Sequence, residues 1–264
     1  MRFNFFLFLL ATQIFLQGCF LDDEKKRESI NMGLSPKELH SKGFDLLNVG
    51  TLDEGIKMME TLQAAYPSSK YAMQSKVDVI YSLYKNDRFD EAIDNSINYI
   101  KLYPKHKSTP YIYYLRALSF EKKSHSILDK FEITDNAERD TSSVKDAFNS
   151  YLDLIRNFPN NKYSNEAKVK LPTLRNILSR HELLVAIFYT KKEAHIAAIN
   201  RCKFIIEKFP NTPSVPAALH LIAHNYDKIN APKLAEDSRR VLKASYPKYT
   251  LTTSQHLMPS TSEG

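Results

Sequence analysis

Glycine is scarce in this chain, at six of 264 residues. Loops that hold phosphate groups on successive backbone N–H groups are built from closely spaced glycines. The scarcity therefore argues against P-loop nucleotide hydrolases and against Rossmann-type dinucleotide enzymes. Segments in which β-branched and polar residues alternate are missing as well, so the sequence predicts an all-α protein.

An excess of either charge along a continuous stretch is also missing. The formal net charge is +7, but the 37 lysines and arginines are scattered among 30 acidic residues. Such a mixture is typical of a solvated surface, and we expect no nucleic-acid partner. With 43% hydrophobic residues, the chain can nevertheless bury a sizeable core.

The longest apolar stretch lies at the amino terminus and is short. It runs from Phe5 to Leu16 behind the positive charge of Arg2. A transmembrane helix needs about 20 apolar residues, so this pattern predicts a signal peptide over residues 1–18.

Cysteine occurs only at positions 19 and 202, and the first follows the apolar stretch directly. The segment Leu16-Gln17-Gly18-Cys19 resembles the lipobox of bacterial lipoproteins, although Gln17 is unusual in it. It predicts acylation of Cys19 and a lipidated linker over residues 19–34. The alternative is an ordinary signal peptide with an incidental cysteine. Lipoproteins that stay at the inner membrane typically have aspartate after the cysteine. Here Phe20 and Leu21 follow it, so localisation to the outer membrane is allowed.

An aromatic residue followed by proline recurs five times, and a small residue stands 12 positions before each proline. The small residues are Gly55, Ala92, Ala147, Ala198 and Ala235. This is the pattern of tetratricopeptide repeats, in which small residues allow paired helices to cross closely and a proline ends the unit. The sequence predicts a superhelical array of about five such repeats.

The spacing also divides the array. We expect repeats 1–3 over residues 35–159, with a polar insertion near 123–141, and repeats 4–5 over residues 160–247. A long connecting helix is expected from about Ser164 to Lys191, kinked or restarted at Pro172. Residues 248–264 are predicted to be disordered. Capping boxes are expected at Ser35-Pro36-Lys37-Glu38 and Thr51-Leu52-Asp53-Glu54.

No catalytic or metal site is predicted. His220 and His224 lie four residues apart, but no glutamate stands between them and no third ligand is apparent. His181-Glu182 does not extend to HExxH. Cys202 falls at a core position of its repeat and is interpreted as a buried hydrophobic residue. We therefore expect no enzyme activity and no cofactor.

Surfaces remain as the candidate functional sites, because repeat arrays present extended concave faces. The repeat numbering places aromatic residues beside cations on that face, where they could bind an extended peptide ending in an aromatic residue and a carboxylate. The alternative is that these aromatics pack in the core. The predicted groove residues are Phe44, Tyr81, Tyr84, Lys85, Tyr111, Tyr114 and Arg116.

The lipobox, the repeats, the insertion and several segments together resemble the BamD family, lipoproteins of the outer-membrane β-barrel assembly machine. Telling segments are VIYSLYKN from Val79, YYLRAL from Tyr113 and AAINR from Ala197. The resemblance covers about Pro36 to Pro247. The departures are Gln17 and Pro172.

This resemblance implies a function and partners. It implies a lipid-anchored protein on the periplasmic face of the outer membrane that binds unfolded β-barrel precursors and the periplasmic domains of the central barrel protein, beside accessory lipoproteins. It also implies that Asn200 and Arg201 belong to the docking site for the barrel protein. The alternative is a lipoprotein scaffold of another envelope system, such as a pilotin or a cell-wall coordination factor.

Overall fold

The computed structural model describes residues 33–129 and 141–250. The predicted signal peptide, Cys19, most of the linker, part of the insertion and most of the C-terminal tail lie outside these ranges. The described residues form ten α-helices and no strand. The all-α prediction is therefore confirmed.

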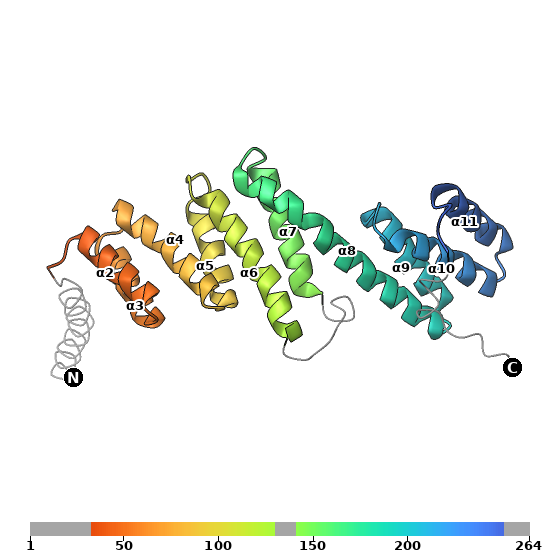
Figure 1. Cartoon of the computed structure of the whole chain (residues 1–264), viewed down its shortest axis with the longest axis horizontal. Coiled ribbons are helices and arrows are strands. Elements are labelled where there is room, and N and C mark those ends of the chain that lie inside the picture. Colours follow the sequence, from red (N-terminus) through yellow and green to blue (C-terminus); the bar gives the residue numbers. More distant parts are fainter. Residues whose placement is uncertain (1–32, 130–140, 251–264) are drawn as a thin grey trace, which may run out of the picture. The chain divides into compact units, whose positions relative to one another are not determined.

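The helices follow one another in pairs (Figure 1). Consecutive helices of each pair pack on one another, and each connection is short apart from the one between α6 and α7. In chain order they are α2 (Pro36–Asn48), α3 (Leu52–Ala65), α4 (Lys70–Lys85), α5 (Phe89–Leu102), α6 (Thr109–Asp129), α7 (Ser142–Asn157), α8 (Lys162–Lys191), α9 (His195–Lys208), α10 (Ser214–Lys228) and α11 (Pro232–Ser245).

The chain divides into two compact units, Met1–Leu102 and Tyr103–Gly264, and we describe each by itself. The first contains α2 to α5, and the second contains α6 to α11. The sequence grouped the third repeat with the first two, up to residue 159. The structure places α6 and α7 in the second unit, because both pack on α8.

The small residues of the repeat pattern lie where the paired helices cross. Ala92, Ala147, Ala198 and Ala235 are completely buried, each on the second helix of its pair. At Gly55, an added Cβ would stand 2.7 Å from the backbone nitrogen of Leu47 on α2. Only a small side chain fits at such a crossing, which confirms the predicted register.

The aromatic residues before the repeated prolines end the second helices in the same way. Tyr66, Phe158, Phe209 and Tyr246 each adopt φ between −138° and −126° and donate the backbone N–H to the carbonyl four residues earlier. The proline that follows cannot extend this hydrogen-bonded ladder. The aromatic side chains are half-buried against the cores of their units.

One predicted helix cap is present and the other is not. The Ser35 hydroxyl accepts a hydrogen bond from the Glu38 amide, and the Glu38 carboxylate accepts one from the Ser35 amide, as a capping box requires. The prediction of a second capping box at Thr51 is wrong, because its side chain makes no cap hydrogen bond. The Thr51 hydroxyl donates instead to the Leu46 carbonyl at 3.2 Å, because the turn from α2 brings that free carbonyl within reach.

Helix α8 runs through Pro172 without restarting. An internal proline removes one hydrogen bond of the helix and costs about 3 kcal/mol. Pro172 is exposed, whereas Ala167 before it and Leu174 and Leu178 after it are buried in one hydrophobic cluster with Leu154 of α7. Burial on both sides of the proline offsets its cost and keeps the helix continuous.

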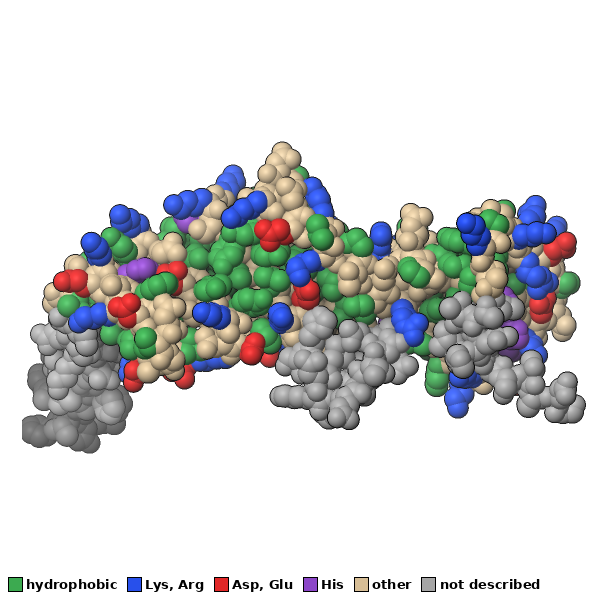
Figure 2. All heavy atoms as spheres, in the orientation of Figure 1, with side chains coloured by type: hydrophobic (Ala, Val, Ile, Leu, Met, Phe, Trp, Pro, Cys, Tyr) green, Lys and Arg blue, Asp and Glu red, His purple; other side chains and the backbone are tan. Residues whose placement is uncertain are grey.

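The predicted insertion begins as a helix. Helix α6 continues to Asp129, well past Lys123, and residues 130–140 lie outside the described ranges. A membrane-crossing helix would have to be both long and strongly apolar, and none of the helices in the described ranges meets these requirements. On the face shown in Figure 2, lysine and arginine side chains are interspersed with acidic ones.

Candidate binding surfaces

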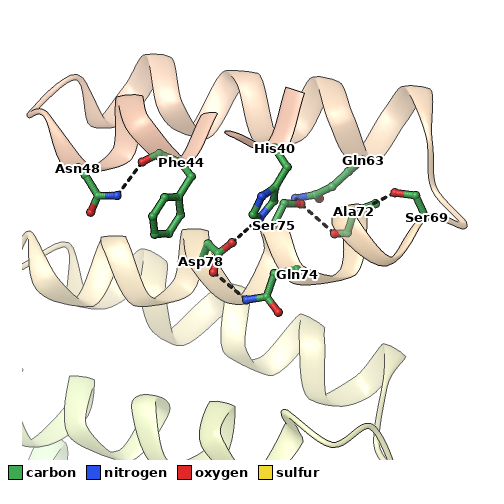
Figure 3. A network of polar contacts seen from close by, with 9 residues as sticks. All are labelled: His40, Phe44, Asn48, Gln63, Ser69, Ala72, Gln74, Ser75 and Asp78. Atoms are coloured by element: carbon green, nitrogen blue, oxygen red, sulfur yellow. Dashed lines mark hydrogen bonds and ion pairs between the residues drawn. The ribbon is translucent and has the colours of Figure 1, made fainter. Parts of the chain in front are cut away.

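The first helices of the two repeats in the first unit, α2 and α4, face each other through a polar and aromatic cluster (Figure 3). His40 Nε2 lies 2.7 Å from Asp78 Oδ2, and Gln74 donates to the other oxygen of Asp78. The His40 ring also stacks on Phe44 and tilts against Tyr71, with ring centroids 6.1 and 5.6 Å apart. The contact between His40 and Asp78 thus holds the side chains of α2 against α4.

Three of the predicted groove residues in this unit are exposed. Phe44 and Tyr81 keep 44% and 43% of their surface accessible, and Lys85 is exposed at the last turn of α4. Tyr84 is half-buried and its ring lies 6.2 Å from that of Phe89. Single exposed apolar residues are common on protein surfaces, but aromatic residues are enriched where a partner binds.

Sequence reasoning missed His40 and Asp78. His40 stands at the fifth position of the first repeat, which the numbering assigned to the concave face, so the signal was available. Asp78 could not be found in this way, because its importance comes from contact with a residue 38 positions earlier.

In the second unit, the predicted groove residues pack with one another. Tyr111 and Tyr114 both contact the ring of Tyr163 at the start of α8, at centroid distances of 5.2 and 5.4 Å. Tyr114 also lies 6.0 Å from the buried ring of Tyr151. These tyrosines are half-buried, so packing accounts for much of their surface.

Arg116 joins α6 to α7. Its side chain is only 15% exposed, contacts Asp153 at 3.4 Å, and lies over the ring of Tyr113. Burial lowers the pKa of its guanidinium, and the charge of Asp153 opposes this shift. The Nε atom is buried without a hydrogen-bond partner. These contacts give Arg116 a packing role, and its predicted contact with a peptide stays a prediction.

The predicted docking residues lie on the solvent face of α9. Asn200 is exposed, and Arg201 donates from Nη1 to Oε2 of Glu182 on α8 at 3.0 Å, with 45% of its side chain accessible. Two apolar residues on the same helix, Ile196 and Phe204, are also exposed. Since residues four apart share a helix face, Ile196, Asn200 and Phe204 form one stripe with Arg201 beside it.

Of the candidate reactive residues, Cys202 lies in the core, and His220 and His224 are half-buried. Cys202 is completely buried, and burial raises the pKa of its thiol to about 12, which confirms the interpretation as a core residue. Burial lowers the pKa of both His220 and His224. Within residues 33–129 and 141–250, no group of three metal-ligating side chains comes together.

These observations define a helical-repeat protein. Comparison with known proteins then identifies it: residues 32–242 match the family model YfiO, described as outer membrane lipoprotein, and the chain belongs to this family. An outer membrane protein assembly factor BamD of Neisseria gonorrhoeae is 34% identical over 86% of this chain and 85% of its own. One from Xylella fastidiosa is 30% identical over 90% of this chain and 80% of its own.

Among solved structures, a thermophilic TPR protein of Thermus thermophilus aligns over 81% of this chain and 93% of its own. Its sequence identity is 14% and the TM-score is 0.34. The helix pairs described above, with their buried small residues, establish the repeat fold without it.

Proposed function

We propose that this protein is an assembly factor for outer-membrane β-barrel proteins, which binds the central barrel protein of the assembly machine and unfolded barrel precursors. The observation that carries the proposal is the similarity to BamD assembly factors along most of both chains. The alternative, a scaffold of another envelope system, has no comparable support.

The proposed anchor is a lipid on Cys19. Three acyl chains on one residue would hold the protein stably at the membrane, since two membrane signals already suffice. The family description as outer membrane lipoprotein supports this proposal. The protein would then lie on the periplasmic face of the outer membrane.

The proposed substrate surface is the face of α2 and α4 in the first unit. Phe44 and Tyr81 offer exposed rings, and Lys85 offers an exposed cation for a chain-terminal carboxylate. Arg116 is a weaker candidate, because Asp153 already neutralises it. An extended precursor segment that ends in an aromatic residue fits this chemistry.

The proposed docking surface for the barrel protein is the stripe on α9. Arg201 has further N–H groups beyond the one that Glu182 accepts, so it can grip a carboxylate of the partner. Ile196 and Phe204 beside it would bury apolar surface in the same contact.

Affinity purification from solubilised outer membranes tests the proposal. We expect the tagged protein to retain the central barrel protein and accessory lipoproteins, and to lose the barrel protein on Arg201→Leu. Recovery of a secretin or of cell-wall enzymes in place of the barrel protein would instead establish the alternative.

A further inference from the structure

A second concave surface of the first unit lies between its second helices. Here α3 and α5 both pack on α4, and together the three helices line a cavity of about 140 Å³. Its floor is apolar and buried, formed by Val79, Ile80, Leu83 and Tyr99. We call this surface the α3–α5 furrow. It contains none of the predicted groove or docking residues.

The size of the cavity suits one apolar side chain. A volume of about 140 Å³ has room for one side chain of the size of leucine or isoleucine above the apolar floor, with charged and amide side chains around it. Asn98 on the α5 wall places an exposed amide group at the mouth, where it can bond to a polypeptide backbone. Asn95 beside it already donates from Nδ2 to the Glu91 carbonyl, and its side-chain oxygen can still accept a hydrogen bond.

At both ends of the furrow, polar side chains are already bonded to other groups of the first unit. At one end, Lys76 donates to Gln63 at 2.7 Å, and Gln63 donates to the Ser75 hydroxyl. At the other end, Arg88 joins Asp53 of α3 to Glu91 of α5. The two cations, Lys76 and Arg88, thus already bind groups of the first unit.

Glu60 on the α3 wall differs from these groups. It is exposed at the mouth, and in the described part of the chain it forms no ion pair. Its charge raises the pKa of Lys76, although burial lowers that pKa more strongly. The furrow therefore offers an apolar floor beside an exposed carboxylate that has no ion-pair contact among the described residues, which favours an apolar side chain next to a lysine or arginine.

The chain enters the first unit near the Gln63 end of this furrow. The Tyr66 hydroxyl donates to the Leu34 carbonyl at 3.0 Å, and Tyr66, which caps the end of α3, follows Gln63 by three residues. Three residues are less than one helical turn of 5.4 Å. The segment that precedes Gly33 therefore starts beside one end of the furrow.

The segment outside the structure has the chemistry that the furrow favours. Residues 20–32 contain four acidic residues and one continuous basic cluster, Lys25 to Arg27, which is followed three positions later by Ile30. An extended chain advances about 3.4 Å per residue, so Ile30 can reach the cavity from Leu34. The basic residues lie three to five positions further back, a distance that would allow them to reach Glu60.

We propose that residues 20–32 bind in the α3–α5 furrow of their own chain, with Ile30 over the apolar floor and the Lys25–Arg27 cluster beside Glu60. This contact fixes the linker against the first unit and so restricts how the repeats are held relative to the anchored end of the chain. The inference does not depend on the partners proposed above.

Zero-length cross-linking of carboxylates to amines in the full-length protein, purified from membranes, tests the contact. We expect a cross-link within one chain between Lys25 or Lys26 and Glu60, with a yield that does not change on dilution. The Lys170–Glu121 pair, at 3.0 Å in the second unit, provides the internal positive control. Cross-links to Glu60 that form only between chains, or none while the control pair reacts, would overturn the proposal.

Limited trypsin digestion provides a second measurement that does not depend on cross-linking. Glu60→Lys should speed cleavage after Lys25, Lys26 and Arg27 by about threefold to fivefold, the effect of losing one exposed ion pair. Glu54→Lys, also exposed on α3 but outside the furrow, is the matched control and should leave the rate unchanged. Equal cleavage rates in the two variants would contradict the docking of the linker.

Discussion

Arg201 on α9 reaches across to Glu182 on α8, and the 3.0 Å hydrogen bond holds its guanidinium at the edge of an exposed apolar stripe. The carboxylate is the more buried partner. It uses one donor of a group that has five, so the arginine is oriented without being saturated. Such an arrangement prepares a side chain to bind a second carboxylate from another protein.

We expect Arg201→Leu to weaken binding of the barrel protein's periplasmic region by tenfold or more, about 1.4 kcal/mol. Loss of a planar guanidinium leaves the partner's carboxylate unpaired, which is costly when the contact is buried. Titration calorimetry measures the effect. Arg240→Leu, at an exposed site on α11 whose charge pairs within its own helix, is the control. If the Arg201 variant binds with unchanged affinity, the docking site does not include Arg201 on α9.

Tyr81→Ala should reduce affinity for a peptide that ends in an aromatic residue and a free carboxylate, because it removes an exposed ring from the proposed substrate surface. The free energy of unfolding should change little. Fluorescence anisotropy with a labelled peptide, followed by denaturant titration, separates the two effects. Tyr99→Ala, at a buried site, should instead lose about 3–5 kcal/mol of stability. Undiminished peptide binding by Tyr81→Ala would argue against this surface.

Cys19→Ala should abolish lipid attachment. The protein should then fractionate away from the outer membrane or retain residues 1–18, because the proposed acylation precedes cleavage at that cysteine. Mass spectrometry and membrane fractionation report the two outcomes. A variant with the parent's mass shift and the parent's fractionation would show that the anchor does not lie at Cys19.

Ala198→Leu should destabilise the second unit by about 1–3 kcal/mol, because it adds three carbon atoms at a completely buried helix crossing. The same change at Ala244, which is exposed on α11, should have little effect. Thermal unfolding followed by circular dichroism compares the two. If Ala198→Leu and Ala244→Leu melt at the same temperature, the helix crossing at Ala198 is not as tightly packed as the structure indicates.

The second unit should lose stability in mild acid. Burial, followed by the neighbouring His224 and Arg239, lowers the pKa of His220 below its ordinary 6.5, and burial also lowers that of His224. The unfolded state therefore takes up protons first as the pH falls, so this stability is present above pH 6.5 and is lost below it. Denaturant titrations above and below pH 6.5 measure the loss. The double change His220→Gln and His224→Gln should flatten the dependence.

The register of the repeats follows from the sequence alone. The spacing between each small residue and its proline reflects helix geometry, which depends on local chain chemistry, and Ala92, Ala147 and Ala198 are buried as that spacing requires. The Ser35 cap is equally local, since both of its hydrogen bonds join residues three apart. A core position for Cys202 could be predicted in the same way.

Tertiary packing decided what the pattern could not. Pro172 breaks helices in local terms, yet α8 continues because residues before and after it share one buried cluster. The sequence predicted Arg116 as a groove cation, but its side chain is largely covered and contacts Asp153, which lies 37 residues further along. The His40–Asp78 pair and the α3–α5 furrow arise from helices that are separate in the chain, and their chemistry exists only where packing brings those helices together.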